Sequence, residues 1–278
     1  MTVGIRAHDL NQSTPDTLAR EVSRLGLNSV QLALNRSFAI ENKPGALNPG
    51  LAYNIGTAFK KHEIQISILG CYGNIIHPDK TQRKTLLDTF KEHIRFARDL
   101  GCGMVGTETG NVNPQIIYDE ANFTEQPFLE VISSVEELVS EAEKFGVIVG
   151  IEPGVNHPIY SPRTMKRLLE SIASNNLQVI FDPVNLLTAE NHHDQHAIFQ
   201  EALDLWGDRI SAMHIKDYHI IDGKLQPAPV GKGLMDYEYI FRDINKRKPM
   251  LNMILDEISI DHIDYGKKYI QGLAVNLW

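Results

Sequence analysis

The chain alternates between short apolar segments and longer amphipathic segments from one end to the other. Eight segments have the length and composition of β-strands: residues 3–7, 29–34, 64–69, 103–107, 147–151, 178–181, 210–214 and 250–255. Each is followed by a helical pattern, at residues 14–26, 51–62, 81–100, 125–145, 164–172, 196–205, 237–244 and in the tail after His262. Strict alternation of this kind predicts a parallel sheet. Eight units without a domain-sized linker favour a single closed (β/α)8 barrel over residues 1–278.

An open, doubly wound sheet is the main alternative to a barrel. Such a sheet usually carries a glycine-rich phosphate loop after its first strand. Here that position has the sequence Arg6-Ala7-His8-Asp9, which has no glycine. The unbroken apolar run at residues 147–151 also suits a strand that is covered on both faces. Both observations favour the barrel.

Charge and composition limit the partners that we expect. The formal net charge is −8, whereas proteins that bind nucleic acids usually have a basic face, so we expect no nucleic-acid partner. No stretch approaches the roughly 18 apolar residues of a membrane-spanning helix, and the N-terminus does not resemble a signal peptide. Cys71 and Cys102 are too few for a disulfide framework. These features predict a cytoplasmic protein without a membrane partner, and a homo-oligomer is possible.

Ionisable residues follow the last four predicted strands. Glu152 and Asp182 come directly after their strands, His214 is the last residue of the seventh, and Asp256-Glu257 follow the eighth. Glu152, Asp182, His214 and Glu257 are separated by 30, 32 and 43 positions, about one βα unit each. Because functional groups gather where barrel strands end, we expect these four side chains to converge. Three carboxylates and an imidazole predict one divalent ion: Mn²⁺, Mg²⁺, Co²⁺ or Zn²⁺.

Further polar residues stand where they could contact a small substrate. His8 follows the first strand, and Glu108 ends the fourth. The segment Gly70-Cys71-Tyr72-Gly73-Asn74 follows the third strand, and we expect Cys71 and Asn74 to contact a ligand there. Lys216, two residues after His214, has the same strand parity. Lys232 lies between two glycines in a loop that could close over substrate.

The ordered motifs resemble the xylose isomerase-like barrel superfamily, specifically its sugar phosphate isomerases and epimerases. The motifs that carry this resemblance are Ile151-Glu152-Pro153, Phe181-Asp182-Pro183-Val184-Asn185, Met213-His214-Ile215-Lys216-Asp217, residues 229–237 and Asp256-Glu257. The resemblance implies that Glu152, Asp182, His214 and Glu257 bind the metal ion. It also implies that Glu152 and Glu257 flank the substrate as the two acid/base groups. The expected substrate is a sugar or polyol.

One position departs from the pattern of this family. Many of its epimerases have a histidine three residues after the aspartate, where this chain has Asn185. Asn185 can still donate a hydrogen bond to a substrate hydroxyl, and His157, five residues after Glu152, could occupy part of the same space. We therefore count both Asn185 and His157 as candidate substrate contacts.

Four functions remain open at this point. The first is metal-dependent isomerisation or epimerisation through an enediolate. The second is a lyase: a dehydratase of the inosose or dehydroshikimate type that uses the same proton abstraction and expels a hydroxyl. The third is a DNA enzyme like the abasic-site endonucleases of the superfamily, which the net charge of −8 and the single histidine in the metal set disfavour. The fourth is a sugar-binding barrel without turnover.

Overall fold

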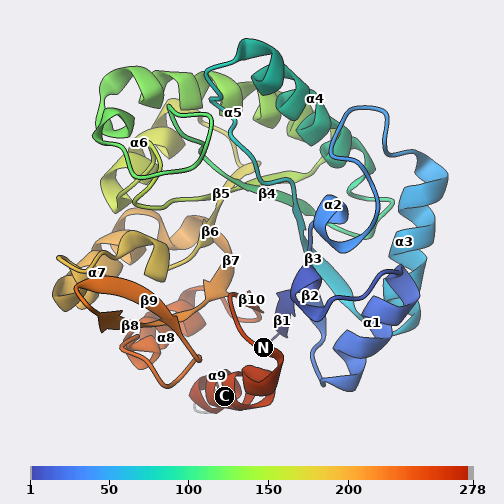
Figure 1. Ribbon diagram of the computed structural model, residues 1–278. Helices are drawn as coiled ribbons and strands as arrows, with labels where there is room; N and C mark the ends of the chain where they lie inside the picture. The colour runs from blue at the N-terminus through green and yellow to red at the C-terminus, as the bar shows by residue number, and fades with distance from the viewer. Residues whose placement is uncertain (1, 275–278) are drawn as a thin grey trace.

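Eight parallel strands form a closed barrel in the computed structural model, which describes residues 2–274. The order around the barrel is β1-β10-β7-β6-β5-β4-β3-β2, so each strand pairs with its neighbours in the sequence and β1 closes the ring against β10 (Figure 1). The strands are β1 (Thr2–Arg6), β2 (Ser29–Leu32), β3 (Gln65–Gly70), β4 (Met104–Glu108), β5 (Ile148–Glu152), β6 (Leu177–Phe181), β7 (Ile210–Ile215) and β10 (Asn252–Leu255). The predicted barrel is confirmed.

The helices form a ring around these strands (Figure 1). The first begins where the sequence predicts: Pro15 occupies its first turn, and the Thr14 hydroxyl accepts a hydrogen bond from the Thr17 amide at 3.3 Å. The large helices are α1 (Pro15–Arg24), α3 (Pro49–Lys61), α4 (Lys80–Phe96), α5 (Glu125–Phe145), α6 (Pro162–Ser171), α7 (Gln195–Trp206), α8 (Tyr237–Arg247) and α9 (Ile263–Ala274). No helix among residues 2–274 is long and apolar enough to cross a membrane.

Two elements interrupt the predicted alternation, and both lie in loops. Helix α2 (Leu34–Ser37) follows β2 at once, so the predicted second strand is shorter than expected. An antiparallel hairpin, β8 (Asp217–Ile221) and β9 (Lys224–Ala228), follows β7 and lies beside α7 and α8 (Figure 1). The Asp217 carboxylate accepts hydrogen bonds from four backbone amides, three of them at residues 231–235, and so fixes the loop after the hairpin.

Side chains inside the barrel form an apolar layer. It consists of Ile68, Met104, Ile180, Ala212 and Ile254. Glycine makes room for the larger members: a Cβ at Gly106 would lie 2.6 Å from Cδ1 of Ile180, and one at Gly150 would lie 2.9 Å from Sδ of Met104. This layer fills the barrel below the ends of the strands.

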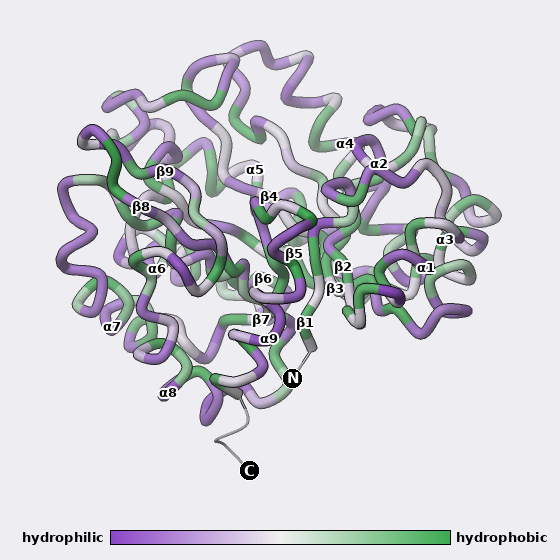
Figure 2. The backbone as a smooth tube through the Cα atoms, turned by 60° about the horizontal axis from the view of Figure 1, so that its bottom comes forward, coloured by the Kyte–Doolittle hydropathy of each residue, from purple (hydrophilic) through white to green (hydrophobic). Residues whose placement is uncertain are grey.

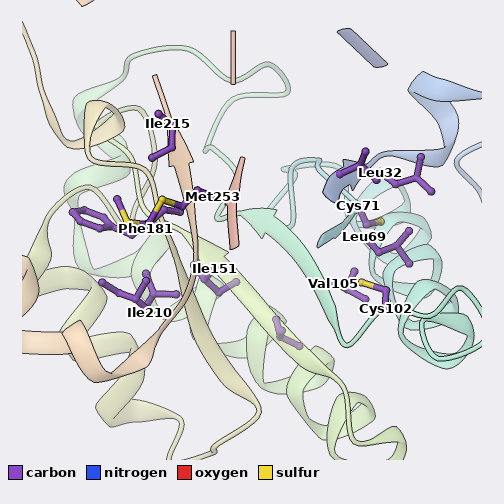
Figure 3. Close-up of a cluster of buried hydrophobic side chains, with 14 of the residues drawn as sticks. Leu32, Leu69, Cys71, Cys102, Val105, Ile151, Phe181, Ile210, Ile215 and Met253 are labelled. Atoms are coloured by element: carbon purple, nitrogen blue, oxygen red, sulfur yellow. The ribbon is translucent and has the colours of Figure 1, made fainter. Parts of the chain in front are cut away.

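The opposite faces of the strands pack against the helices. Leu69, Val105, Ile151, Phe181 and Met253 belong to this larger apolar cluster (Figure 3). Hydrophobic residues run along the central strands, whereas much of the outer chain is hydrophilic (Figure 2). The barrel is therefore covered on both faces, and its strand ends are left to present polar groups.

Candidate metal centre

The ionisable residues of the last four barrel strands lie one step above the apolar layer. Side chains of a strand alternate between its two faces, so a residue two positions beyond an interior one also points inward. Gly150, Ile180, Ala212 and Ile254 are interior positions. Two residues further on, the chain has Glu152, Asp182, His214 and Asp256.

Three of these residues form a compact and buried set of donors. One ligand atom from each of Glu152, Asp182 and His214 lies within 4.8 Å of the others, and the three residues are at most 3% exposed. Nδ1 of His214 lies 3.2 Å from Oε1 of Glu152 and 3.8 Å from Oδ2 of Asp182. Two carboxylates and an imidazole at this spacing can hold a divalent ion.

The imidazole of His214 is oriented for this role by Gln31. Nε2 of His214 donates a hydrogen bond to Oε1 of Gln31 at 2.6 Å, which directs Nδ1 toward the carboxylates. Nδ1 of His214 and Oδ2 of Asp182 are buried, and neither makes a hydrogen bond of good geometry within the described chain, although each has an oppositely charged neighbour, Glu152 at 3.2 Å and Lys216 at 3.0 Å. Buried polar atoms without hydrogen bonds are rare, and here both belong to the same donor set. The donor set therefore fits a metal ion.

Glu152 is fixed by hydrogen bonds to both of its oxygens. Nδ2 of Asn185 donates to Oε1 at 2.6 Å, and the hydroxyl of Tyr72 donates to Oε2 at 2.9 Å. Asn185 is placed by Asp182, whose Oδ1 accepts from the Asn185 amide at 3.2 Å. The predicted contact residue Asn185 thus holds a carboxylate of the donor set.

The prediction selected Glu257 as the fourth ligand, but in the structure the neighbouring residue Asp256 lies closer to the group of three donors. Asp256 continues the inward parity of β10, is 4% exposed, and has Oδ2 3.7 Å from Nδ1 of His214. The Glu257 side chain is 45% exposed and lies outside the group of three donors. Glu257 has a positive φ of 52°, a left-handed backbone that is uncommon away from glycine. The side chain still lines the cavity described below.

Lys216 introduces a positive charge into the same cluster. Its Nζ lies 3.0 Å from Oδ2 of Asp182, 3.2 Å from Oδ2 of Asp256 and 3.9 Å from Oε1 of Glu257. Burial opposes the charge, but these carboxylates outweigh it and raise the pKa of Lys216. The lysine is placed by Tyr237, whose hydroxyl donates to the Lys216 carbonyl at 2.6 Å. Lys216 therefore neutralises part of the carboxylate charge.

The histidine and the buried carboxylates perturb one another. Burial lowers the pKa of His214, but Glu152, Asp256 and Asp182 outweigh it and raise that pKa to about 9. Burial raises the pKa of Glu152, although His214 opposes the shift. Burial also disfavours the charge of Asp256, but Lys216 and His214 hold its pKa below the usual value. At neutral pH and without a metal ion, His214 is therefore an imidazolium that balances its acidic neighbours.

A cavity of about 160 Å³ opens beside this cluster. Its walls include the predicted residues His8, Glu108, Glu152, His214, Lys216 and Glu257. Glu108 is paired with His157, whose Nε2 lies 3.5 Å from Oε1 of Glu108 and whose Nδ1 donates to the Gly110 carbonyl at 2.8 Å. Burial opposes this charge pair, but the contact with Glu108 outweighs it and raises the pKa of His157. His157 therefore supports Glu108 from behind the cavity wall.

Five predicted contact residues do not line the cavity. His157 and Asn185 contact residues that do line it, Glu108 and Glu152, whereas the other three have their partners elsewhere. Cys71 is 2% exposed and packs in the apolar cluster with Leu69 (Figure 3), because it points to the helix side of the barrel. The Asn74 side chain forms hydrogen bonds with backbone groups of residues 76, 111 and 113, which fixes two loops. Lys232 lies over the Tyr265 ring, with Nζ 4.7 Å from the ring centre. None of the three lines the cavity.

Several residues of the site escaped the sequence analysis, although the sequence holds a signal for each. Gln31 is a polar residue in the middle of the apolar segment Val30-Gln31-Leu32. Arg6 ends the first strand, and its Nη1 lies 2.6 Å from Oδ1 of Asp256. Counting two residues from Ile254 would have selected Asp256. In each case the missing step was strand parity, which distinguishes inward from outward residues at a strand end.

Comparison with solved structures supports the fold over the whole chain. A D-tagatose 3-epimerase-like protein has 14% identity and a TM-score of 0.78, covering 100% of this chain and 98% of that one. The IOLI protein with a bound zinc atom has 14% identity and a TM-score of 0.76, covering 100% and 99%. A xylose isomerase-like TIM barrel protein from Mycobacterium smegmatis in complex with magnesium has 18% identity and a TM-score of 0.73, covering 100% and 97%.

The sequence itself also identifies the family. No curated protein sequence gives a significant match. The xylose isomerase-like TIM barrel family, in contrast, matches residues 19–273, which is most of the chain. The protein therefore belongs to the xylose isomerase-like TIM barrel family.

Proposed function

We propose that this protein is a metal-dependent isomerase or epimerase of a small sugar or sugar derivative. The observation that carries the proposal is the buried group of Glu152, Asp182 and His214, with one ligand atom of each within 4.8 Å of the others. We assign these three residues as ligands and Asp256 as a fourth candidate beside Glu257. The epimerase-like and metal-containing proteins with the same fold support this assignment.

The chemistry follows from the groups that surround the cavity. A bound divalent ion supplies Lewis-acid polarisation of a carbonyl oxygen and stabilises the negative charge that develops on it. Glu152 and Glu257 both line the cavity and are the candidate groups that remove a proton from carbon and return it. Hydrogen bonds from Asn185 and Tyr72 orient the Glu152 carboxylate. Lys216 limits the repulsion between Asp182 and Asp256, both of which it contacts.

The experiment that tests this proposal measures metal and proton exchange together. Purified protein is analysed for bound metal and then incubated with ketoses and inososes in D₂O, and the products are followed by NMR. We expect about one divalent ion per chain and solvent deuterium at a carbon next to a carbonyl group. Protein that binds no Mn²⁺, Mg²⁺, Co²⁺ or Zn²⁺ would contradict the proposal. Product that has lost water would assign the dehydratase instead.

Two variants separate the metal-binding role from proton transfer. Glu257→Gln removes a carboxylate that lies outside the group of three, so we expect metal content to persist while exchange falls about a hundredfold or more. Asp256→Asn removes a buried carboxylate 3.7 Å from Nδ1 of His214, so we expect metal affinity itself to fall. If Glu257→Gln loses the ion and Asp256→Asn keeps it, the ligand originally predicted from sequence is the right one.

A further inference from the structure

Three permanently cationic side chains line the cavity, and two of them are already neutralised. They are Arg6, Arg36 and Lys216. The guanidinium of Arg6 contacts Asp9 at 3.0 and 3.1 Å and Asp256 at 2.6 Å. Lys216 contacts Asp182 and Asp256, as described above. The positive charges of Arg6 and Lys216 are therefore already balanced by carboxylates of the protein.

Arg36 differs from both. It lines the same cavity from α2 and is exposed, and its guanidinium makes no ion pair and no side-chain hydrogen bond to any described residue. The other arginine of the cavity has two acidic partners. In a chain of net charge −8 the carboxylates outnumber the basic groups, so an unmatched guanidinium at a cavity wall is a distinctive feature.

The backbone holds Arg36 at a defined place relative to the metal centre. Gln31, Ala33 and Arg36 come from one segment and line the cavity in turn. Gln31 contacts His214, whereas Arg36 is exposed. The amides of Arg36 and Ser37 donate to the Ala33 carbonyl at 3.1 and 2.9 Å, which fixes the turn. The cavity wall therefore includes both His214 of the donor set and Arg36.

His8 adds a second unsatisfied group to the cavity. Its ring Nδ1 is buried and has no hydrogen-bond partner within residues 2–274. Burial lowers the pKa of His8. Asp9 opposes this shift, Arg6 and Arg36 add to it, and the net pKa lies below the ordinary value of 6.5, so the ring is neutral near pH 7. A neutral imidazole can bond to an uncharged hydroxyl. The cavity therefore offers one free cation and one free neutral polar group apart from the metal centre.

We propose that the substrate of this enzyme is a small sugar acid or keto acid whose carboxylate binds Arg36. The inference rests on the proposed function, which places the reacting carbon at the metal centre. A guanidinium binds one carboxylate through two parallel hydrogen bonds, and one unmatched positive charge balances one negative charge. A phosphate dianion is usually met by several donors or by the N-terminus of a longer helix. The helices that contain lining residues of this wall, Ala7–Leu10 and α2, have only four residues each. The cavity volume of about 160 Å³ also favours a compact ligand.

Three probes that differ in one group test the proposal. Isothermal titration calorimetry of the metal-loaded protein at low ionic strength compares D-glucuronate, D-glucose 6-phosphate and D-glucose. We expect D-glucuronate to bind at least about tenfold more tightly than D-glucose in the wild type. Arg36→Gln should remove this preference and leave the affinity for D-glucose within twofold. Arg242→Gln is the control, because it removes an equally positive, exposed side chain on α8, outside the cavity lining.

The possible results of these titrations distinguish a carboxylate ligand from the alternatives. A wild type that binds D-glucose as tightly as D-glucuronate, or binds neither, contradicts it, and so does a preference that survives Arg36→Gln. A stronger preference for D-glucose 6-phosphate, lost in Arg36→Gln, replaces the carboxylate with a phosphate. Metal content and deuterium exchange, measured on the same samples, separate the two proposals. Carboxylate preference without metal or exchange would overturn the function alone, whereas metal and exchange without the preference would overturn this inference alone.

Discussion

The interior of the barrel has two layers that are built by the same strands and differ in chemistry. The lower layer is apolar and includes Ile180, Ala212 and Ile254. Two residues further along, the same strands present Asp182, His214 and Asp256. The lower layer fills the barrel, and Asp182, His214 and Asp256 above it are at most 4% exposed, so charges in the upper layer interact more strongly than they would in water. The comparison indicates that one layer stabilises the fold and the other is placed for chemistry.

The largest effect that this comparison predicts is on metal binding. Asp182→Asn keeps the Oδ1 acceptor that bonds to the amides of residues 184 and 185, so the local turn should persist. It replaces the buried Oδ2, which lies 3.0 Å from Nζ of Lys216 and 3.8 Å from Nδ1 of His214, with an amide nitrogen that cannot coordinate an ion. We expect metal affinity and turnover to fall about a thousandfold or more, since changing residues that merely support ligands costs 10–100-fold. Elemental analysis and deuterium exchange measure both effects.

The exposed Asp208→Asn variant is the control for this substitution. It removes the same charge from a side chain that is 87% exposed. Full metal binding by Asp182→Asn would show that the upper layer does not hold the ion.

The second largest effect should fall on stability. Ile180→Ala changes a fully buried residue two positions before Asp182 and leaves a void in the lower layer. We expect the free energy of unfolding to fall by about 2–5 kcal/mol, as for other buried isoleucines. The folded fraction should still bind the ion with nearly unchanged affinity. Chemical denaturation and metal titration measure the two quantities, and a variant that lost affinity while staying folded would show that the layers are coupled.

Sequence reasoning reached the barrel and most of the candidate centre, because both depend on regular patterns. The spacing of apolar residues identifies which segments are strands and which are helices. The position of Glu152, Asp182 and His214 at strand ends then places them at one end of the barrel. Gln31 and Asp256 were missed as parts of the site, since their roles depend on the side of the strand to which they point. Cys71 was expected to contact a ligand, but its position on β3's continuation turns it toward the helices. The three-dimensional structure was therefore needed to decide which of two adjacent residues at a strand end points into the barrel.

The stability of the metal-free protein should depend on pH, and this effect should be the third largest. The folded pKa of His214 is about 9, above the ordinary value of 6.5, so the folded state holds a proton that the unfolded state releases. The resulting stabilisation is complete below pH 6.5 and is lost as the pH rises to about 9, by a few kcal/mol at most. Saturating Mn²⁺ should remove this dependence, because Nδ1 cannot hold a proton and a metal ion together.

Thermal unfolding at several pH values measures this effect. His157, whose pKa is also raised, contributes in the same direction. The difference between wild type and His214→Gln therefore isolates the part that His214 contributes. A difference that does not change between pH 6.5 and 9 would contradict the charged, metal-free state of the upper layer.

The smallest effect should come from a residue that only orients a ligand. Gln31→Leu removes the acceptor for Nε2 of His214 but no atom of the donor group, so we expect metal affinity to fall 10–100-fold while the ion can still bind. Gln31→Glu keeps an acceptor at this place and should restore affinity, which a purely structural role would not predict. Ser67→Ala, on the neighbouring strand, removes a buried hydroxyl that bonds to the Val30 carbonyl and should leave affinity unchanged. If Gln31→Leu and Ser67→Ala behave alike in a metal titration, Gln31 supports the barrel and not the imidazole, and the upper layer then ends at the residues that touch the ion.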